Sequence, residues 1–356
     1  MIEPKNHLKN LKRTRDKEGS RLFKHRLDRN ERNQPFSERF MNNIRDKISG
    51  ELFMVYPQLD NVYKKMAKWL NIDSRKVLLH SSSEQAIKSV FETFVRKGDR
   101  VLLHFPGFAM YEVYCRMFEA EIAAQHYDRK LNFDWDEFLG KISKDVRMVV
   151  VENPNGFLGI APPLDILRRI AERALRVGAI LLVDEAYYHF HEETAIGWIG
   201  EYDNLIVVRT FSKAFGLAGL RAGYLVSQPE NIAELNKVRP AYELNSVACV
   251  LILELLDNFG EVDSYLNDTR NNIKALKKGL EELGIATSDS KANFVAARLG
   301  GKNIHDKLRQ ALKEKHNILI RRPFREEHLK EWVRISTAPP EIQRILLGEL
   351  KDVLSR

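Results

Sequence analysis

The sequence predicts an α/β fold built on a mainly parallel sheet, with a smaller α+β unit towards the C-terminus. Short, continuous apolar runs follow one another between residues 100 and 209, and segments with helical spacing of apolar residues separate them. Apolar strands that alternate with helices are typical of a parallel sheet covered on both faces. The length of 356 residues also exceeds that of a usual single domain.

The elements of the large unit follow in order from Ser82 or Ser83, either of which can cap a helix that extends to about residue 95. The sequence Lys-Gly-Asp at residues 97–99 ends this helix. Strands are expected at residues 100–104, 146–151, 178–184 and 205–209, and helices at residues 109–118 and 164–176. Ligands of such sheets bind beyond the carboxyl ends of the strands, so a site is expected there.

Long helices dominate from about residue 248, for example at 262–283. Short strands are expected at residues 294–297, 318–320 and 332–335, and Pro339 opens a last helix near residues 341–354. We therefore expect an N-terminal segment (1–45) that packs on the small domain, a large domain (46–247) and a small C-terminal domain (248–356).

Positive charge is densest from Lys5 to Arg32, within a formal net charge of +8 that comes from interspersed charges of both signs. A solvated arm is the favoured interpretation of this segment. No motif for nucleic acid accompanies it, so no nucleic-acid partner is expected. Attraction of anionic, for instance phosphorylated, substrates stays open.

Cys115 and Cys249 lack metal-ligand spacing and do not make a disulfide framework, which fits a reducing cytoplasm and no metal site. The N-terminus is polar and charged, unlike a signal peptide. The longest apolar run, at residues 247–253, is too short to span a bilayer, so no membrane association is expected.

Lys213 lies just past the apolar run at residues 205–208, among small residues. Burial penalises an ammonium group, so a lysine in a tight pocket loses part of its preference for the charged form. A neutral amine can attack a carbonyl and hold it as a Schiff base. Arg221, in the same glycine-rich run, offers donors suited to a phosphate. An aldehyde site beside a phosphate site indicates pyridoxal 5'-phosphate as the cofactor.

The run at residues 210–224 reads Thr-x-Ser-Lys-Ala-x-Gly-x-Ala-Gly-Leu-Arg-x-Gly-Tyr. It resembles the lysine segment of fold-type I pyridoxal phosphate enzymes, and most of all that of class I/II aminotransferases of the histidinol-phosphate aminotransferase type. The resemblance extends from about Leu27 to the C-terminal helix, and it implies an aspartate aminotransferase-like, seven-stranded large domain. It also implies that Lys213 carries the cofactor as an aldimine, that Arg221 binds its phosphate, and that Thr210 and Ser212 donate hydroxyls to that phosphate.

Asp184 ends its apolar strand, where a carboxylate can pair with a protonated pyridine nitrogen and keep the ring electron-poor. Tyr187 can hydrogen-bond the 3'-oxygen of the ring. For the Asp-Glu pair alone, a cap at the strand end is the simpler interpretation. The position of Lys213 one strand later favours the functional interpretation, and the resemblance to the family's Asp-x-x-Tyr supports both assignments.

Three further segments are candidates for cofactor binding. Ser82, Ser83 and Glu84 lie at a helix start, where backbone N–H groups and the helix dipole favour an anion. Phe108 matches the aromatic residue that stacks on the cofactor ring in relatives. Tyr56, which precedes a proline, resembles the family's tyrosine that reaches the cofactor phosphate of the partner subunit, and this implies a homodimer with a shared active site.

Candidate substrate-binding residues also follow from the resemblance. Arg334 matches the arginine that grips the substrate α-carboxylate, and a bidentate pair would fix the Cα–H bond relative to the ring. Arg321 matches a second arginine on the substrate side, and Arg322 beside it is a further candidate. Asn30 lies in a Leu-Asp-x-Asn-Glu segment that resembles a family loop near the substrate.

One departure concerns the loop in which the family reads Pro-Asn-Asn-Pro-Thr-Gly. The second asparagine, which hydrogen-bonds the ring 3'-oxygen, falls on Gly156. Asn155 or Asn153 can substitute, although neither matches position for position. Loss of one donor to that oxygen should raise the aldimine pKa and open room beside the ring.

The predicted function is therefore that of a pyridoxal phosphate-dependent aminotransferase with ping-pong kinetics. It moves an amino group between an amino acid, or a phosphorylated amine such as histidinol phosphate, and a 2-oxo acid, and Lys213 transfers the proton. Two alternatives stay open. One is a decarboxylase of phosphorylated amino acids, such as phosphothreonine or phosphoserine, and the other is a non-catalytic regulatory module that binds the cofactor.

Overall fold

The computed structural model describes residues 2–9, 11 and 20–355, so the basic segment from Lys5 to Arg32 lies partly outside the described residues. A seven-stranded sheet has the order β2-β8-β7-β6-β5-β3-β4, in which β8 is antiparallel to both of its neighbours. The remaining neighbours pair in parallel, which confirms the predicted mainly parallel α/β sheet. The strands are β2 (Val77–His80), β3 (Arg100–Phe105), β4 (Glu121–His126), β5 (Val146–Glu152), β6 (Ile180–Asp184), β7 (Leu205–Thr210) and β8 (Gly223–Ser227).

Alternate residues of the central strands face two separate hydrophobic cores, because successive side chains of a strand point to opposite faces. In β5, for example, Val149 and Val151 belong to one core, whereas Met148 and Val150 belong to the other. The first core is covered by α2 (Asp60–Leu70), α5 (Trp135–Gly140), α6 (Leu164–Val177) and α8 (Ser246–Asp257), and the second by α3 (Ser83–Phe94), α4 (Met110–Met117) and α7 (Pro229–Asn236).

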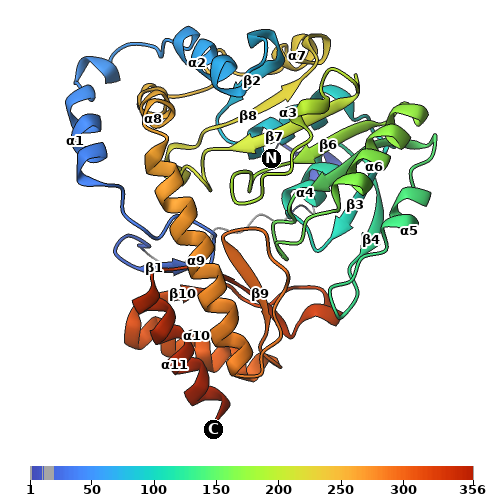
Figure 1. Cartoon of the computed structure of the whole chain (residues 1–356). Helices are drawn as coiled ribbons and strands as arrows, with labels where there is room; N and C mark the ends of the chain where they lie inside the picture. Colours follow the sequence, from blue (N-terminus) through green and yellow to red (C-terminus); the bar gives the residue numbers. More distant parts are fainter. Residues whose placement is uncertain (1, 10, 12–19, 356) are drawn as a thin grey trace.

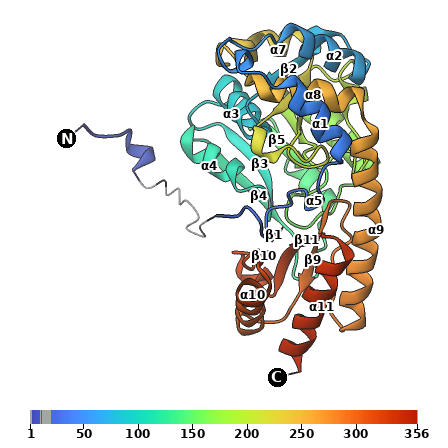
Figure 2. The same ribbon diagram turned by 90° about the vertical axis from the view of Figure 1, so that its left-hand side faces the viewer.

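A second unit follows towards the C-terminus, below the large sheet in Figure 1. It contains an antiparallel pair, β9 (Phe294–Arg298) with β11 (Trp332–Ser336), together with α10 (Lys302–His316) and α11 (Pro340–Leu354). The long helix α9 (Gly260–Glu282) connects the units, because Val262 and Leu266 pack in the first core and Leu276 and Leu280 in the C-terminal one. Figure 2 shows α9 along one side of both units.

The N-terminal segment contacts both units. Strand β1 (His25–Leu27) pairs in parallel with β10 (Ile318–Ile320), so it belongs with the C-terminal unit. Helix α1 (Glu38–Lys47) instead places Phe40 and Ile44 in the first core, against the large unit. The predicted domain limits at residues 45 and 248 stay predictions, and the packing of α8 and α9 favours a division within α9.

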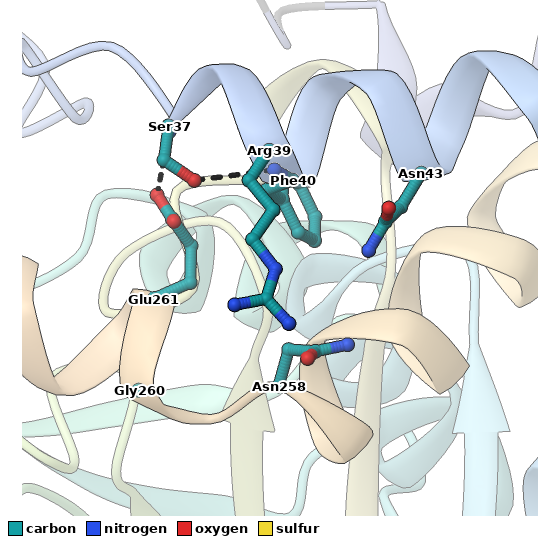
Figure 3. Close-up of a pocket in the computed structure, with 7 residues that line it drawn as sticks. All are labelled: Ser37, Arg39, Phe40, Asn43, Asn258, Gly260 and Glu261. Carbon is teal, nitrogen blue, oxygen red and sulfur yellow. Dashed lines mark hydrogen bonds between the residues drawn. The ribbon is translucent and has the colours of Figure 1, made fainter.

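A hollow of about 260 Å³ lies between α1 and the start of α9 (Figure 3). The backbone N–H of Ser37 donates to Glu261 at 3.1 Å, and its hydroxyl accepts from the Phe40 N–H at 3.2 Å, so the same serine joins the two helices and caps α1. None of the residues that line this hollow is a predicted site residue.

Cys115 and Cys249 are buried and free in α4 and α8. Among the described residues, no group of His, Cys, Asp or Glu side chains is placed to hold a metal ion. Within the same part of the chain, no helix is long and apolar enough to cross a membrane.

Candidate active site

The carboxyl ends of the central strands meet at one edge of the sheet, and the predicted site residues gather there. Asp184 is the last residue of β6 and Thr210 the last residue of β7. Lys213 follows β7 directly, in the loop before β8. A buried ion pair steadies this edge, because Arg209 of β7 donates through Nε and Nη2 to Glu185 at 2.9 and 2.8 Å.

The Lys213 amine points towards the N-terminal segment, and its Nζ donates to the Arg29 carbonyl oxygen at 2.8 Å. Part of the side chain is accessible. Burial of the amine, followed by the positive charge of Arg334, lowers the pKa of Lys213 to about 7. A substantial fraction of this amine is therefore neutral near pH 7, as a nucleophilic or proton-transferring lysine requires.

Asp184 is buried and held by two donors. The Tyr111 hydroxyl donates to Oδ2 at 2.7 Å, and the Ala186 N–H donates to Oδ1 at 3.0 Å. Burial raises the pKa of Asp184 to about 6, whereas the Tyr111 hydrogen bond acts in the opposite direction. The carboxylate is thus mostly ionised at neutral pH and suited to a cationic ring nitrogen. Tyr111 was missed from the sequence, where it appears as an ordinary member of an apolar helix.

Tyr187 and Asn30 lie side by side, although they are far apart in the chain. The Asn30 Nδ2 donates to the Tyr187 hydroxyl oxygen at 2.7 Å, and the Ser336 hydroxyl donates to the Asn30 Oδ1 at 2.7 Å. Asn30 is fully buried and has a left-handed backbone with φ of 57°. The loop that the sequence placed near the substrate therefore orients a predicted cofactor contact.

The start of α3 and the loop around Arg221 form the predicted phosphate end of the site. Ser82 caps α3, because its hydroxyl accepts from the Gln85 N–H at 3.3 Å. The backbone of Gly223 passes so close that a Cβ there would lie 2.3 Å from the Ser83 nitrogen. A side chain at position 223 would therefore displace the backbone at this helix start, whose N–H groups are the predicted phosphate donors.

Three further predicted phosphate contacts lie on the same side. The Thr210 hydroxyl accepts from the Ser212 N–H at 3.1 Å, so these two residues are locally joined. Arg221 is half-exposed, and its Nη2 lies 4.0 Å from the Glu84 Oε2. The Glu84 side chain is thus a neighbour of Arg221, and the predicted donors to the phosphate are the backbone N–H groups at the start of α3.

Arg334 and Arg321 both contact one aromatic ring. Their Cζ atoms lie 5.3 and 4.8 Å from the centre of the Phe157 ring. Arg334 is buried and donates to the carbonyl oxygens of Gly156 and Asp28 at 2.6 and 3.1 Å. Burial and then the charge of Arg321 lower the pKa of Arg334 to about 10. Two cations that share one buried region favour an anionic ligand between them.

The loop after β5 holds the side chains of Asn155 and Asn153 in hydrogen bonds within the protein. Asn155 is fully buried, and its amide is used within the protein: Nδ2 donates to the Pro106 carbonyl at 2.7 Å, and Oδ1 accepts from Phe157 and Leu158 N–H at 2.8 Å each. Asn153 likewise donates to the Glu193 carbonyl at 3.0 Å. Both asparagine side chains thus stabilise the loop. Their hydrogen bonds argue against either of them replacing the family's asparagine at position 156 as a donor to the ring 3'-oxygen.

Two aromatic candidates differ in position. Phe108 lies in the loop between β3 and α4, with its ring edge-on to Tyr111 at 6.0 Å. Tyr56 is 74% exposed and stacks on Tyr242 at 4.4 Å, away from the Lys213 cluster of its own chain. The contact of Tyr56 with a partner's cofactor stays a prediction.

These residues fit pyridoxal phosphate as a set. A desolvated amine suits the aldehyde, an ionised buried aspartate suits the ring nitrogen, and a glycine-lined helix start suits the phosphate. Among the described residues, the buried Arg334 Nε has no hydrogen-bond partner, which leaves a donor for a ligand. The fold and the site thus define a pyridoxal phosphate-dependent enzyme.

The profile of the family described as "Aminotransferase class I and II" matches residues 26–346, and the chain belongs to this family. It is 30% identical to the histidinol-phosphate aminotransferase of Caldanaerobacter subterraneus over 338 residues, which cover 94% of each chain. The histidinol-phosphate aminotransferase of Thermoanaerobacter sp. is also 30% identical, with 93% of each chain covered.

Solved structures share the fold. The histidinol-phosphate aminotransferase of Sinorhizobium meliloti in complex with pyridoxal-5'-phosphate superposes with a TM-score of 0.84 at 22% identity, over 93% of this chain and 91% of that one. The L-threonine-O-3-phosphate decarboxylase of Porphyromonas gingivalis gives 0.80 at 21% identity, over 93% and 100%. Family membership confirms the predicted aminotransferase and its cofactor, and it does not favour the decarboxylase or the regulatory module.

Replacement of the buried amine should change stability in a pH-dependent way. In protein freed of cofactor, Lys213 has a pKa of about 7 when folded and an ordinary value of 10.5. Between these two pH values the unfolded chain holds a proton on Lys213 that the folded protein has lost. The buried amine therefore lowers the free energy of unfolding by its full amount below pH 7, and this destabilisation fades as the pH rises towards 10.5. Lys213→Met should therefore raise the free energy of unfolding most at pH 6 and progressively less up to pH 10, measured by urea denaturation. A difference that does not vary with pH would contradict this, and Lys130→Met, at an exposed lysine, is the control.

The close approach at Gly223 should be required for cofactor binding. Gly223→Ala would force its Cβ against the Ser82–Ser83 backbone and displace the N–H groups at the start of α3. We expect the cofactor Kd to rise about tenfold or more, the effect of losing one hydrogen bond to a charged group. Fluorescence titration of the cofactor-free protein measures this. Gly219→Ala is the matched control, because nothing lies within 4 Å of a Cβ there; equal Kd values for the two variants would refute the assignment.

Proposed function

We propose that this aminotransferase uses a phosphorylated amine or amino acid of the histidinol phosphate type as donor and a 2-oxo acid as acceptor, in amino acid biosynthesis. The names of the relatives with 30% identity support this choice of donor. The observation that carries the proposal is the pair of cations, Arg334 and Arg321, which both lie close to the Phe157 ring. A phosphate or a carboxylate would compensate both charges.

The side chains have separate roles in this proposal. Bound pyridoxal phosphate supplies an aldehyde for the amine and a ring that accepts electrons from the substrate carbon. Arg334 holds the anionic group of the substrate and thereby orients its Cα–H bond. The neutral Lys213 amine removes and returns the proton at Cα. Asp184 keeps a proton on the ring nitrogen, and Tyr187, held by Asn30, donates to the ring oxygen.

A donor screen tests the proposal. The holo-protein is incubated with single amino donors, including phosphorylated ones, and conversion to the pyridoxamine form is followed by absorbance. We expect the fastest conversion with a phosphorylated donor. In Arg321→Ala this preference should fall about tenfold or more, because one charge-assisted contact is lost, whereas Arg344→Ala, at an exposed position on α11, serves as control. Equal rates for phosphorylated and unphosphorylated donors, or release of carbon dioxide, would contradict the proposal.

We also propose that the protein is a homodimer with a shared active site and that it acts in the cytoplasm. A short segment exposes a run of apolar side chains, namely Phe53, Met54, Val55 and Tyr56, which are 53–83% accessible. A contiguous exposed apolar patch of this kind commonly marks a protein interface. The buried free cysteines support a reducing compartment.

Sedimentation equilibrium tests the dimer. Wild-type protein should sediment at twice the chain mass of 41.3 kDa. Met54→Glu places a charge in the apolar patch and should yield monomer with weakened cofactor binding, because Tyr56 then loses the partner's site. Leu354→Glu, at an exposed apolar position on α11, should remain dimeric. A monomeric wild type at micromolar concentration would exclude the shared site.

A further inference from the structure

Glu152 is a buried acid at the site to which the predicted reaction assigns no role. It is the last residue of β5 and lies in register with Asp184 on β6, so both carboxyl groups leave the sheet at the same edge. The side chain is only 4% exposed. The Phe108 N–H donates to Oε1 and the Gly156 N–H donates to Oε2, each at 2.7 Å. The group is thus fixed between the loop of the ring-stacking candidate and the loop that departs from the family pattern.

Two glycines make room for this carboxyl group. A Cβ on Gly107 would lie 2.6 Å from Oε1, and a Cβ on Gly156 would lie 2.9 Å from Oε2. Both distances are shorter than real contacts, so a side chain at position 156 would require the Glu152 carboxyl group to shift, and one at position 107 would also meet the His104 carbonyl oxygen at 2.7 Å. The absence of a side chain at position 156 and the presence of a glutamate at position 152 are therefore linked.

The space concerned borders the predicted contact to the ring oxygen. The Cβ position of Gly156 is also 3.6 Å from Cε2 of Tyr187, the carbon next to the one that bears the hydroxyl. A side chain at position 156 would point into the region that the Glu152 carboxyl and the Tyr187 ring edge now enclose. In the family pattern an asparagine side chain projects from this position towards the 3'-oxygen.

We propose that Glu152, as a neutral carboxylic acid, donates a hydrogen bond to the 3'-oxygen of pyridoxal phosphate and so replaces the asparagine missing at position 156. Each carboxyl oxygen keeps its backbone donor, because a protonated acid retains acceptor lone pairs beside its O–H group. Glu152 would then be a cofactor-contacting residue that takes over the role of the family's asparagine.

The surroundings of Glu152 favour its neutral form. Burial, and then the nearby Asp184 carboxylate, raise the pKa of Glu152 to about 8. Two buried carboxyl groups at one strand edge cannot easily both ionise, and Asp184 is the one with the hydroxyl donor from Tyr111. The charged and titratable groups around Glu152 are Asp184, Tyr111, Tyr127, Tyr187, Arg334 and His104, the last of which accepts the Glu152 N–H at 3.0 Å.

The test is the pH midpoint of the absorption change of the lysine-bound cofactor. A hydrogen bond donated to the ring oxygen withdraws negative charge from that oxygen. Because this negative charge stabilises the protonated form of the lysine-bound cofactor, loss of the donor raises the pH midpoint. Glu152→Ala should raise it by about one to two pH units, the size of a hydrogen bond to a charged group. If Glu152 were instead an anion, its removal would lower the midpoint, and that result would overturn the proposal. Glu121→Ala, at an exposed strand start, controls for the loss of an acid.

An exchange of the residues at positions 152 and 156 distinguishes the loss of one hydrogen bond to the cofactor from a general disruption of the site. Gly156→Asn alone should lose cofactor, because its Cβ meets Glu152. The double variant Glu152→Ala/Gly156→Asn restores both the room and a donor, so its midpoint should return to within a few tenths of a pH unit of wild type. The double variant remains informative if Glu152→Ala does not fold. A double variant that keeps a raised pH midpoint, or that folds without binding cofactor, would contradict the proposal that Glu152 replaces the asparagine. A wild-type protein that shows no absorption band of bound cofactor would instead refute the assigned enzyme class.

Discussion

The desolvation of one amine is the constraint on which this site depends. Lys213 leaves a strand that is buried on both faces, and its Nζ finds the Arg29 carbonyl as an acceptor. With Arg334 near it, the amine has a pKa of about 7, far from the value of a solvated lysine. A covalent bond between Lys213 and the cofactor aldehyde, as proposed, would remove the free amine and with it this desolvation penalty.

Segments from both ends of the chain complete the site. The loop after β1 provides Arg29 and Asn30, and β11 provides Ser336 and Arg334. Strand β1 pairs with β10, so the N-terminal segment and the C-terminal unit together provide the residues proposed to bind the substrate. The large sheet provides the cofactor side, with Asp184 and Thr210 at adjacent strand ends. The residues proposed for substrate recognition and those proposed for cofactor chemistry therefore come from separate parts of the fold that meet at Lys213.

Local patterns were sufficient for the elements that are long or strongly apolar. The strands at residues 146–151 and 205–209 and the helix at 164–176 were predicted within a residue at each end, because burial on both faces or amphipathic spacing leaves a clear signal. The antiparallel direction of β8 was not predictable, since strand direction depends on partners distant in sequence. Glu152 and Tyr111 were missed for the same reason: their roles arise from contacts with Gly107, Gly156 and Asp184, and a single acid or tyrosine in an apolar segment does not reveal them.

The central claim is that Lys213 is the residue that binds the cofactor covalently. Borohydride reduction of the holo-protein makes the bond between cofactor and lysine permanent, and peptide mass spectrometry then locates it. The account predicts a single modified peptide that carries the added mass on Lys213. Modification of another lysine, or no modified peptide from a protein with bound cofactor, would contradict it.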